Sequence, residues 1–160
     1  MPSAAAPPFA ASAPILVSGP PGAGKSTVGR LVARAIGVPF VDLDEVIVER
    51  AGTSIATLFA RDGEAAFRTR ERAELEVLLG GRQRCVIALG GGTLLDPSSR
   101  AHALERGVVV GLRAPVDTLA QRLARDTSRP LLASDDGSAV HDRLESLVEA
   151  RRAIYDVAHV

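Results

Sequence analysis

The first residues that could do chemistry form a glycine-rich stretch near the amino terminus. Residues 19–26 read Gly-Pro-Pro-Gly-Ala-Gly-Lys-Ser and match the P-loop pattern G-x-x-x-x-G-K-[ST]. In such a loop, successive backbone N–H groups surround phosphates and the lysine ammonium reaches the β- and γ-phosphates. Lys25 is also the only lysine of the chain, which favours a site that needs a compact ammonium rather than a planar guanidinium. We therefore predict a nucleotide phosphate site, with Ser26 holding Mg²⁺, formed by Gly22, Ala23, Gly24, Lys25, Ser26 and Thr27.

A pair of carboxylates follows the next apolar run. Asp42 and Asp44 flank Leu43, and residues two apart on a strand point to the same side. Both carboxylates would then face the ligand crevice at the carboxyl end of a parallel sheet. One would lie near the metal, and the other would accept a hydroxyl proton. The alternative is a charge pair at a helix N-terminus, because Asp44 and Glu45 also begin a helical pattern.

Three further features could complete such a site. Arg68 and Glu71 are three residues apart on a predicted helix and share a face, although an exposed ion pair would have the same spacing. Residues 90–92 are three glycines after an apolar run, and they would leave backbone open to a ligand. Arg129 lies in a stretch without periodicity, from which it could close over the γ-phosphate.

The elements that must position these residues alternate along the chain. Short apolar runs predict strands at residues 15–18, 39–42, 85–89 and 108–112. Helical spacing predicts helices at 26–36, 44–51, 54–60, 64–79, 98–105, 115–125 and 141–155. Alternating strands and helices indicate an α/β protein: a three-layer α/β/α P-loop NTPase fold with a parallel sheet flanked by helices. Residues 127–137 are predicted to form a mobile lid loop.

Composition restricts the class of protein further. The chain has 160 residues and a net charge of zero, which fits one domain and gives no sign of a nucleic-acid or membrane partner. No apolar run is long enough to span a bilayer and no targeting segment is evident, so a cytoplasmic location is expected. The first 14 residues are almost all Ala, Pro and Ser, which predicts a disordered tail or linker before a domain at 15–160.

Two residue types are expected to have structural roles only. The single cysteine, Cys85, lies in an apolar run and is interpreted as a reduced core residue. The histidines His102, His141 and His159 are scattered without the spacing of metal ligands, so a zinc site is not expected.

In combination, these motifs resemble the shikimate kinase family over residues 15–160. The resemblance is carried by the P-loop, Asp-x-Asp at 42–44, Phe-Arg-x-x-Glu at 67–71, the three glycines, Arg-Pro-Leu-Leu at 129–132 and a late Arg-x-x-x-Tyr at 151–155. It implies a monomeric enzyme that uses Mg²⁺ and ATP to phosphorylate the 3-hydroxyl of shikimate, on the route to chorismate.

The resemblance also implies roles for individual residues. Lys25, Asp44 and Arg129 would be catalytic, with Asp44 binding the shikimate hydroxyls as base and Arg129 as the lid arginine. Asp42 would lie near Mg²⁺, and Arg122 near the adenine. The substrate carboxylate would be clamped by Arg68 and Arg151, with Glu71 fixing Arg68, while the ring hydroxyls would meet backbone at Gly90, Gly91 and Gly92. The apolar side of the pocket would be lined by Phe59, Phe67, Pro130 and Leu131.

The sequence departs from the family pattern at two places. The family's late motif has proline where this chain has Ala153, which predicts a looser turn around Arg151 and makes Arg152 a rival for its role. The chain also ends where the family's last strand and C-terminal helix would begin. We therefore expect a fragment, or one domain of a longer polypeptide, with an exposed edge along the fourth strand.

Two other functions remain open at this point. One is another small-molecule kinase of the same fold, such as a gluconate kinase, although Arg68, Arg151 and the three glycines favour a cyclic carboxylate. The other is a kinase-derived domain that senses a ligand without turnover, for which the retained Lys25 and Asp44 would have no use.

Overall fold

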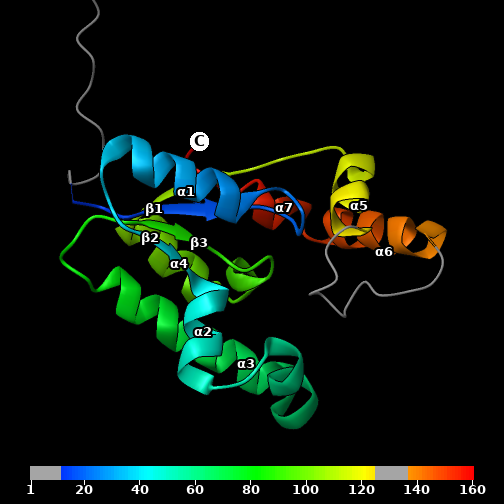
Figure 1. The fold of residues 1–160 in the computed structure, drawn as a ribbon, viewed down its shortest axis with the longest axis horizontal. Coiled ribbons are helices and arrows are strands. Elements are labelled where there is room, and N and C mark those ends of the chain that lie inside the picture. Colours follow the sequence, from blue (N-terminus) through cyan, green and yellow to red (C-terminus); the bar gives the residue numbers. More distant parts are fainter. Residues whose placement is uncertain (1–11, 125–136) are drawn as a thin grey trace, which may run out of the picture.

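Four parallel strands form the centre of the molecule. The computed structural model describes residues 12–124 and 137–160, and within them the strand order is β2-β3-β1-β4 (Figure 1). The strands are β1 (Ile15–Ser18), β2 (Phe40–Asp42), β3 (Val86–Ala88) and β4 (Val108–Gly111). In the centre, Leu16 pairs with Ile87 on one side and Val109 on the other. The strands lie where apolar runs predicted them, and they are parallel because helices connect them.

Helices cover both faces of this sheet. Helix α1 (Lys25–Ile36) lies on one face, while α2 (Leu43–Ala51), α3 (Ile55–Leu79) and α4 (Pro97–Arg106) lie on the other (Figure 1). At one end of the sheet, α5 (Val116–Ala124) packs against α6 (Gly137–Ala150). A 3₁₀ turn, η1 (Thr93–Leu95), and the short helix α7 (Arg152–Tyr155) complete the described elements. The predicted α/β fold with a parallel sheet flanked by helices is confirmed.

Two helix boundaries differ from the prediction for local reasons. The helices predicted at 54–60 and 64–79 are one element, α3, with a kink at Gly63, where φ is 79°. Glycine adopts this left-handed conformation at little cost. The helix predicted at 141–155 begins earlier and breaks at Arg151, where φ is −107° and ψ is 5°. That break separates α6 from α7 and leaves Arg151 between the two helices. The predicted lid at 127–137 lies almost wholly outside the described residues.

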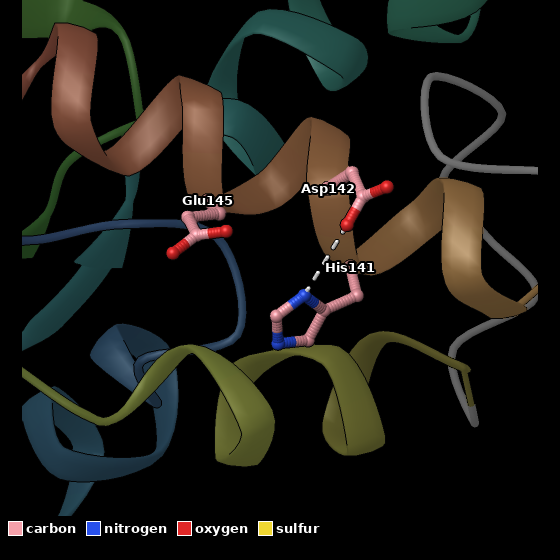
Figure 2. Close-up of side chains that lie close together, drawn as sticks. All are labelled: His141, Asp142 and Glu145. Atoms are coloured by element: carbon pink, nitrogen blue, oxygen red, sulfur yellow. Dashed lines mark ion pairs between the residues drawn. The ribbon is translucent and has the colours of Figure 1, made fainter.

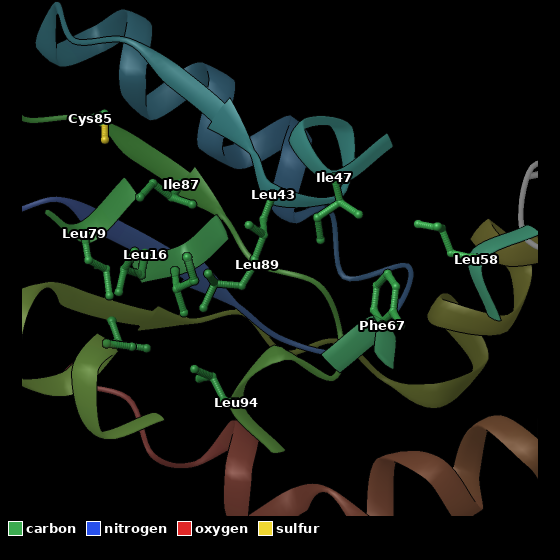
Figure 3. Packing of buried hydrophobic residues seen from close by; sticks show 13 residues of the cluster. Leu16, Leu43, Ile47, Leu58, Phe67, Leu79, Cys85, Ile87, Leu89 and Leu94 are labelled. Carbon is green, nitrogen blue, oxygen red and sulfur yellow. The ribbon is translucent and has the colours of Figure 1, made fainter. Parts of the chain in front are cut away.

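The main hydrophobic core lies between the sheet and the α2–α3–α4 layer (Figure 3). Its side chains are at most 9% exposed, and each large one contributes about 1.5–3 kcal/mol to folding. Cys85 belongs to this core, where burial raises the pKa of its thiol, as expected for an unreactive cysteine. A smaller cluster of Ala23, Leu119, Leu123 and Leu144 fixes the P-loop against α5 and α6.

Both ends of the described chain contact β4. Pro14, which was assigned to the tail, is buried, and its carbonyl accepts a hydrogen bond from the Val108 N–H at 2.9 Å. After α7 the chain turns back, so the His159 N–H donates to Val109 O at 2.8 Å and the Gly111 N–H donates to Val160 O at 2.9 Å. The prediction of an exposed edge along β4 is therefore wrong, because these last residues pair with it. Among residues 12–124 and 137–160, no helix combines the length and hydrophobicity needed to cross a membrane.

Candidate active site

The P-loop joins β1 to α1 and is shaped to surround an anion. Gly22 and Gly24 have φ values of 79° and 92°, which only glycine adopts easily. Gly24 caps α1 without any side-chain hydrogen bond, so the first N–H groups of the helix point into the loop. The Lys25 ammonium lies in the same place: it is 8% exposed and donates to the carbonyls of Gly19 and Pro20 at 2.9 and 3.0 Å. The Lys25 ammonium and the first backbone N–H groups of α1 therefore lie in the same loop, where they can bind an anion together.

Asp42 links the P-loop to the start of α2. Its Oδ2 accepts a hydrogen bond from Ser26 Oγ at 2.5 Å. Its Oδ1 caps α2 by accepting from the Asp44 N–H at 3.0 Å. The helix N-terminal interpretation is confirmed, since Asp42 caps α2 and Asp44 lies in its first turn, while a role of the other Asp42 oxygen near a metal stays a prediction. Serine and carboxylate oxygens side by side are the donors that Mg²⁺ prefers.

Asp44 reaches the site by a different route from the predicted one. Because Asp42 caps α2, the helix begins at Leu43, and Asp44 lies in its first turn rather than on a strand. The inference from strand alternation was wrong for this reason. The Asp44 carboxylate nevertheless lies beside the three glycines: a Cβ added at Gly90 would be 3.0 Å from Asp44 Oδ1 and 2.8 Å from Glu71 Oε1. Gly90 therefore leaves room for two carboxylates.

Arg68 and Glu71 form a largely buried network rather than an exposed pair. The Glu71 side chain is 3% exposed, and its Oε2 accepts from Arg68 Nη1 at 2.7 Å. Its Oε1 accepts from the buried Thr93 hydroxyl at 2.7 Å. A buried carboxylate that keeps both partners holds its cation in a fixed orientation. Thr93 was missed by the sequence analysis, because no local spacing relates it to Glu71.

Each of the other two glycines touches a different part of the site. Gly92 has φ −120°, which any residue can adopt, yet a Cβ there would lie 2.5 Å from Arg68 Nη2. A Cβ at Gly91 would lie 3.2 Å from Pro21 of the P-loop. The Gly91 carbonyl accepts from Arg151 Nη1 at 3.2 Å and from the Tyr155 hydroxyl at 2.9 Å. The three glycines thus bring the P-loop, the carboxylates and two arginines together.

The remaining predicted residues divide into four groups. Arg122, on α5, donates to the Gly22 carbonyl at 3.1 Å, so it lies at the P-loop. Arg152 is 66% exposed and pairs with Glu149, so Arg151 rather than Arg152 is the arginine that contacts Gly91. Arg129 lies outside the described residues, as do Pro130 and Leu131. The rings of Phe59 and Phe67 are in contact, tilted by 36° with centroids 4.6 Å apart, and the 4% exposed Phe67 belongs to the core.

A second polar cluster lies on α6 and faces α5 (Figure 2). His141 Nε2 is 2.8 Å from Asp117 Oδ1, and this hydrogen bond raises the pKa of the imidazole. Ligand atoms of His141, Asp142 and Glu145 lie within 4.8 Å of one another. The three histidines are scattered along the sequence as stated, but His141 and Glu145 form an i,i+4 pair on this helix that was not considered. Its carboxylates are exposed, and the cluster contains none of the predicted site residues.

Both the sequence and the fold of this chain are similar to those of known proteins. The family model for shikimate kinase matches residues 21–160. A curated shikimate kinase from Halorhodospira halophila (strain DSM 244 / SL1) is 48% identical over 91% of this chain and 81% of that protein. A shikimate kinase from Acinetobacter baumannii, solved in complex with shikimate, is similar with a TM-score of 0.86 and 38% identity, covering 93% of this chain and 82% of that one. A gluconokinase from Sinorhizobium meliloti 1021 has a TM-score of 0.52 and 24% identity, covering 88% of this chain and 77% of that one, and it shares the fold alone.

Proposed function

Since this chain belongs to the shikimate kinase family, we propose that it transfers the γ-phosphoryl group of ATP to the 3-hydroxyl of shikimate, giving shikimate 3-phosphate and ADP. The observation that carries the proposal is the position of the three glycines. Gly91 lies against Pro21 of the P-loop, and Gly92 lies against the Arg68 guanidinium. The proposed phosphate site and the proposed carboxylate site would thereby be adjacent. Shikimate is a small carboxylate triol, which requires cations at one end and hydrogen-bond acceptors at the other.

On the nucleotide side, the P-loop would hold the phosphates of ATP. The Lys25 ammonium would exchange the carbonyls of Gly19 and Pro20 for β- and γ-phosphate oxygens. Ser26 and Asp42 would hold Mg²⁺, which the 2.5 Å contact between their oxygens supports. When bound, the ion neutralises charge on the phosphoryl oxygens. Arg122 would lie near the adenine, and Arg129 would close over the γ-phosphate.

On the acceptor side, Asp44 would act as the base. The 3-hydroxyl of shikimate would donate its hydrogen bond to the Asp44 carboxylate, and its oxygen would attack the γ-phosphorus as the proton moves to Asp44. The position of Asp44 beside Gly90 supports this role. Phosphoryl transfer depends mainly on positioning and on neutralising charge, so an acceptor held against the P-loop by fixed groups suits the reaction.

The carboxylate of shikimate would be bound by Arg68 and Arg151. Arg68 is held by Glu71, which is held in turn by Thr93, so its guanidinium is oriented before substrate arrives. Arg151 is near the same glycines and would supply the second cation. Two guanidinium groups also favour a carboxylate over an uncharged sugar.

A coupled ADP-release assay tests this function. The protein with Mg²⁺-ATP should turn over shikimate, with the 3-phosphate identified by ³¹P NMR, and should leave gluconate unchanged. Turnover of gluconate alone would support the other small-molecule kinase. Binding of shikimate by calorimetry without release of ADP would support a ligand-sensing domain, and either result would contradict the proposal.

Replacement of Gly92 by alanine tests the carboxylate clamp. The backbone at φ −120° accepts alanine, but the new methyl would displace the Arg68 guanidinium from its hydrogen bond to Glu71. Because a hydrogen bond to a charged group contributes about 1.5–3 kcal/mol, we expect KM for shikimate to rise roughly 10- to 100-fold. KM for ATP should stay within about twofold, because the P-loop is untouched.

The matched control is Gly80→Ala at the end of α3, where φ is −78° and an added Cβ would meet only the backbone of the same helix. That variant should keep both KM values. Equal changes in both KM values for Gly92→Ala would show that the whole site had shifted. The result would then contradict the proposal that Arg68 binds the carboxylate of shikimate at Gly92.

We further propose that the enzyme acts as a cytoplasmic monomer without nucleic-acid or membrane partners. The net charge of zero supports the last part, because binding to polyanions normally requires a positive field.

A further inference from the structure

Two donors converge on one carbonyl in the middle of the site. The Gly91 oxygen accepts from Arg151 Nη1 at 3.2 Å and from the Tyr155 hydroxyl at 2.9 Å. A carbonyl oxygen has two lone pairs, so both bonds can form together. Arg151 directly precedes α7 and Tyr155 ends it, which places both side chains on the side that faces the glycines. Tyr155 belongs to the late Arg-x-x-x-Tyr pattern at 151–155, but no role was predicted for it.

The surroundings of Tyr155 keep its hydroxyl a donor. The side chain is 6% exposed, and burial raises the pKa of the phenol above its usual value. The group therefore stays protonated at any pH at which the enzyme would work. Arg151 and Arg68 act in the opposite direction and are the charged groups near it. A neutral, fixed donor is suited to holding a backbone carbonyl rather than to transferring a proton.

The backbone at Gly91 needs such a support. A glycine has no side chain to anchor it and has more conformational freedom than any other residue. Gly91 also sets the spacing between the two halves of the site, because an atom in its Cβ position would touch Pro21 of the P-loop. A small shift of this peptide would therefore disturb the Arg151 contact to its carbonyl and weaken the binding of the acceptor.

Tyr155 also makes it possible for Arg151 to leave the Gly91 carbonyl. When Arg151 turns to a substrate carboxylate, its hydrogen bond to Gly91 is lost or weakened. A half-buried carbonyl without a partner is costly, and the Tyr155 hydroxyl prevents that cost. Ala153 lies two residues after Arg151, so no proline ring stiffens this turn. The bond from Tyr155 to Gly91 holds α7 in place instead.

We propose that Tyr155 is a positioning residue for the acceptor: it holds the Gly91 peptide and α7, and thereby leaves Arg151 available for the carboxylate of shikimate. This inference rests on the proposed function. Tyr155 is not a catalytic residue, because its hydroxyl is already engaged by backbone.

Replacement by phenylalanine removes the hydroxyl and keeps the ring in the core. We expect Tyr155→Phe to raise KM for shikimate about three- to tenfold, as for loss of one neutral hydrogen bond, with kcat and KM for ATP within about twofold. Thr69→Val is the matched control, because it deletes an exposed hydroxyl that bonds only to the Ala65 carbonyl of the same helix. It should leave both KM values unchanged.

A spectroscopic measurement on the unmodified chain gives a second readout. Tyr155 is the only tyrosine and the chain has no tryptophan, so the near-ultraviolet phenol band reports on this one hydroxyl. Adding shikimate should shift that band, because the Gly91 carbonyl changes its partners, whereas adding gluconate should not.

The outcomes separate the two proposals. If the wild-type protein does not turn over shikimate, the proposed function fails whatever Tyr155 does. If it does, and Tyr155→Phe has the wild-type KM for shikimate, the positioning role is wrong. Equal increases in both KM values with a lower Tm would show that Tyr155 acts only in folding, and this also overturns the proposal.

Discussion

Replacement of Lys25 by alanine is expected to abolish phosphoryl transfer, lowering kcat by about 10³-fold or more. The ammonium lies inside the P-loop, 8% exposed and bonded to the carbonyls of Gly19 and Pro20. No other lysine exists in the chain to replace it. A positive charge placed where phosphoryl charge develops is worth most in a water-poor site. The rate of ADP release at saturating shikimate measures the loss.

Lys25→Arg is the informative companion to this variant. It retains the charge, but a planar guanidinium does not reproduce the compact ammonium that bonds to the carbonyls of Gly19 and Pro20, so we expect it also to lose most activity. Circular dichroism should show that both variants are folded. Retention of more than about a tenth of the wild-type kcat in Lys25→Ala would mean that the phosphates are bound elsewhere.

Replacement of Asp44 by asparagine is expected to lower kcat by about 10²- to 10⁴-fold while leaving ATP affinity intact. Asparagine has the same shape but cannot take the proton of the shikimate hydroxyl. The Asp44 backbone N–H bonds to Asp42, and the Asp44 carboxylate lies near Gly90 on the proposed acceptor side of the site. Steady-state kcat and the dissociation constant for ATP from calorimetry measure the two effects separately.

Asp62→Asn provides the control for the change of charge. Asp62 is on α3 and pairs only with the adjacent, exposed Arg61 at 2.7 Å, so its loss should leave kcat unchanged. If Asp44→Asn weakens ATP binding and leaves kcat at saturation unchanged, Asp44 belongs to the nucleotide side, and another group must be the base.

The agreement between sequence and structure differs from element to element. The P-loop was predictable because its function depends on contiguous residues and on backbone angles that few residue types adopt. The role of Asp44 stays a prediction, but the reasoning from strand alternation that led to it was wrong. Strand alternation was extended two residues beyond the end of β2, although Asp42 followed by Asp44 and Glu45 also has the composition of a helix N-terminus.

Residues that act through long-range contacts were harder to predict. Arg68 and Glu71 could be paired by helical spacing, but nothing local indicated that Glu71 is 2% exposed or that Thr93 holds its other oxygen. Tyr155 was part of a sequence pattern, but the pattern did not indicate what its hydroxyl contacts. The i,i+4 spacing of His141 and Glu145 was visible in the sequence but was not considered. A hydroxyl directly after a glycine run is a signal that could have identified Thr93.

The amino-acid sequence by itself determined the alternation of strands and helices and the position of the glycine-rich loop between β1 and α1. These features follow from local backbone preferences and from periodic burial, which a sequence records directly. Only the tertiary structure decided which arginine meets Gly91, why Gly92 has no side chain and what covers the edge of β4. The physical reason is that these contacts join segments far apart along the chain. Their geometry depends on how helices pack on the sheet, and no local rule specifies it.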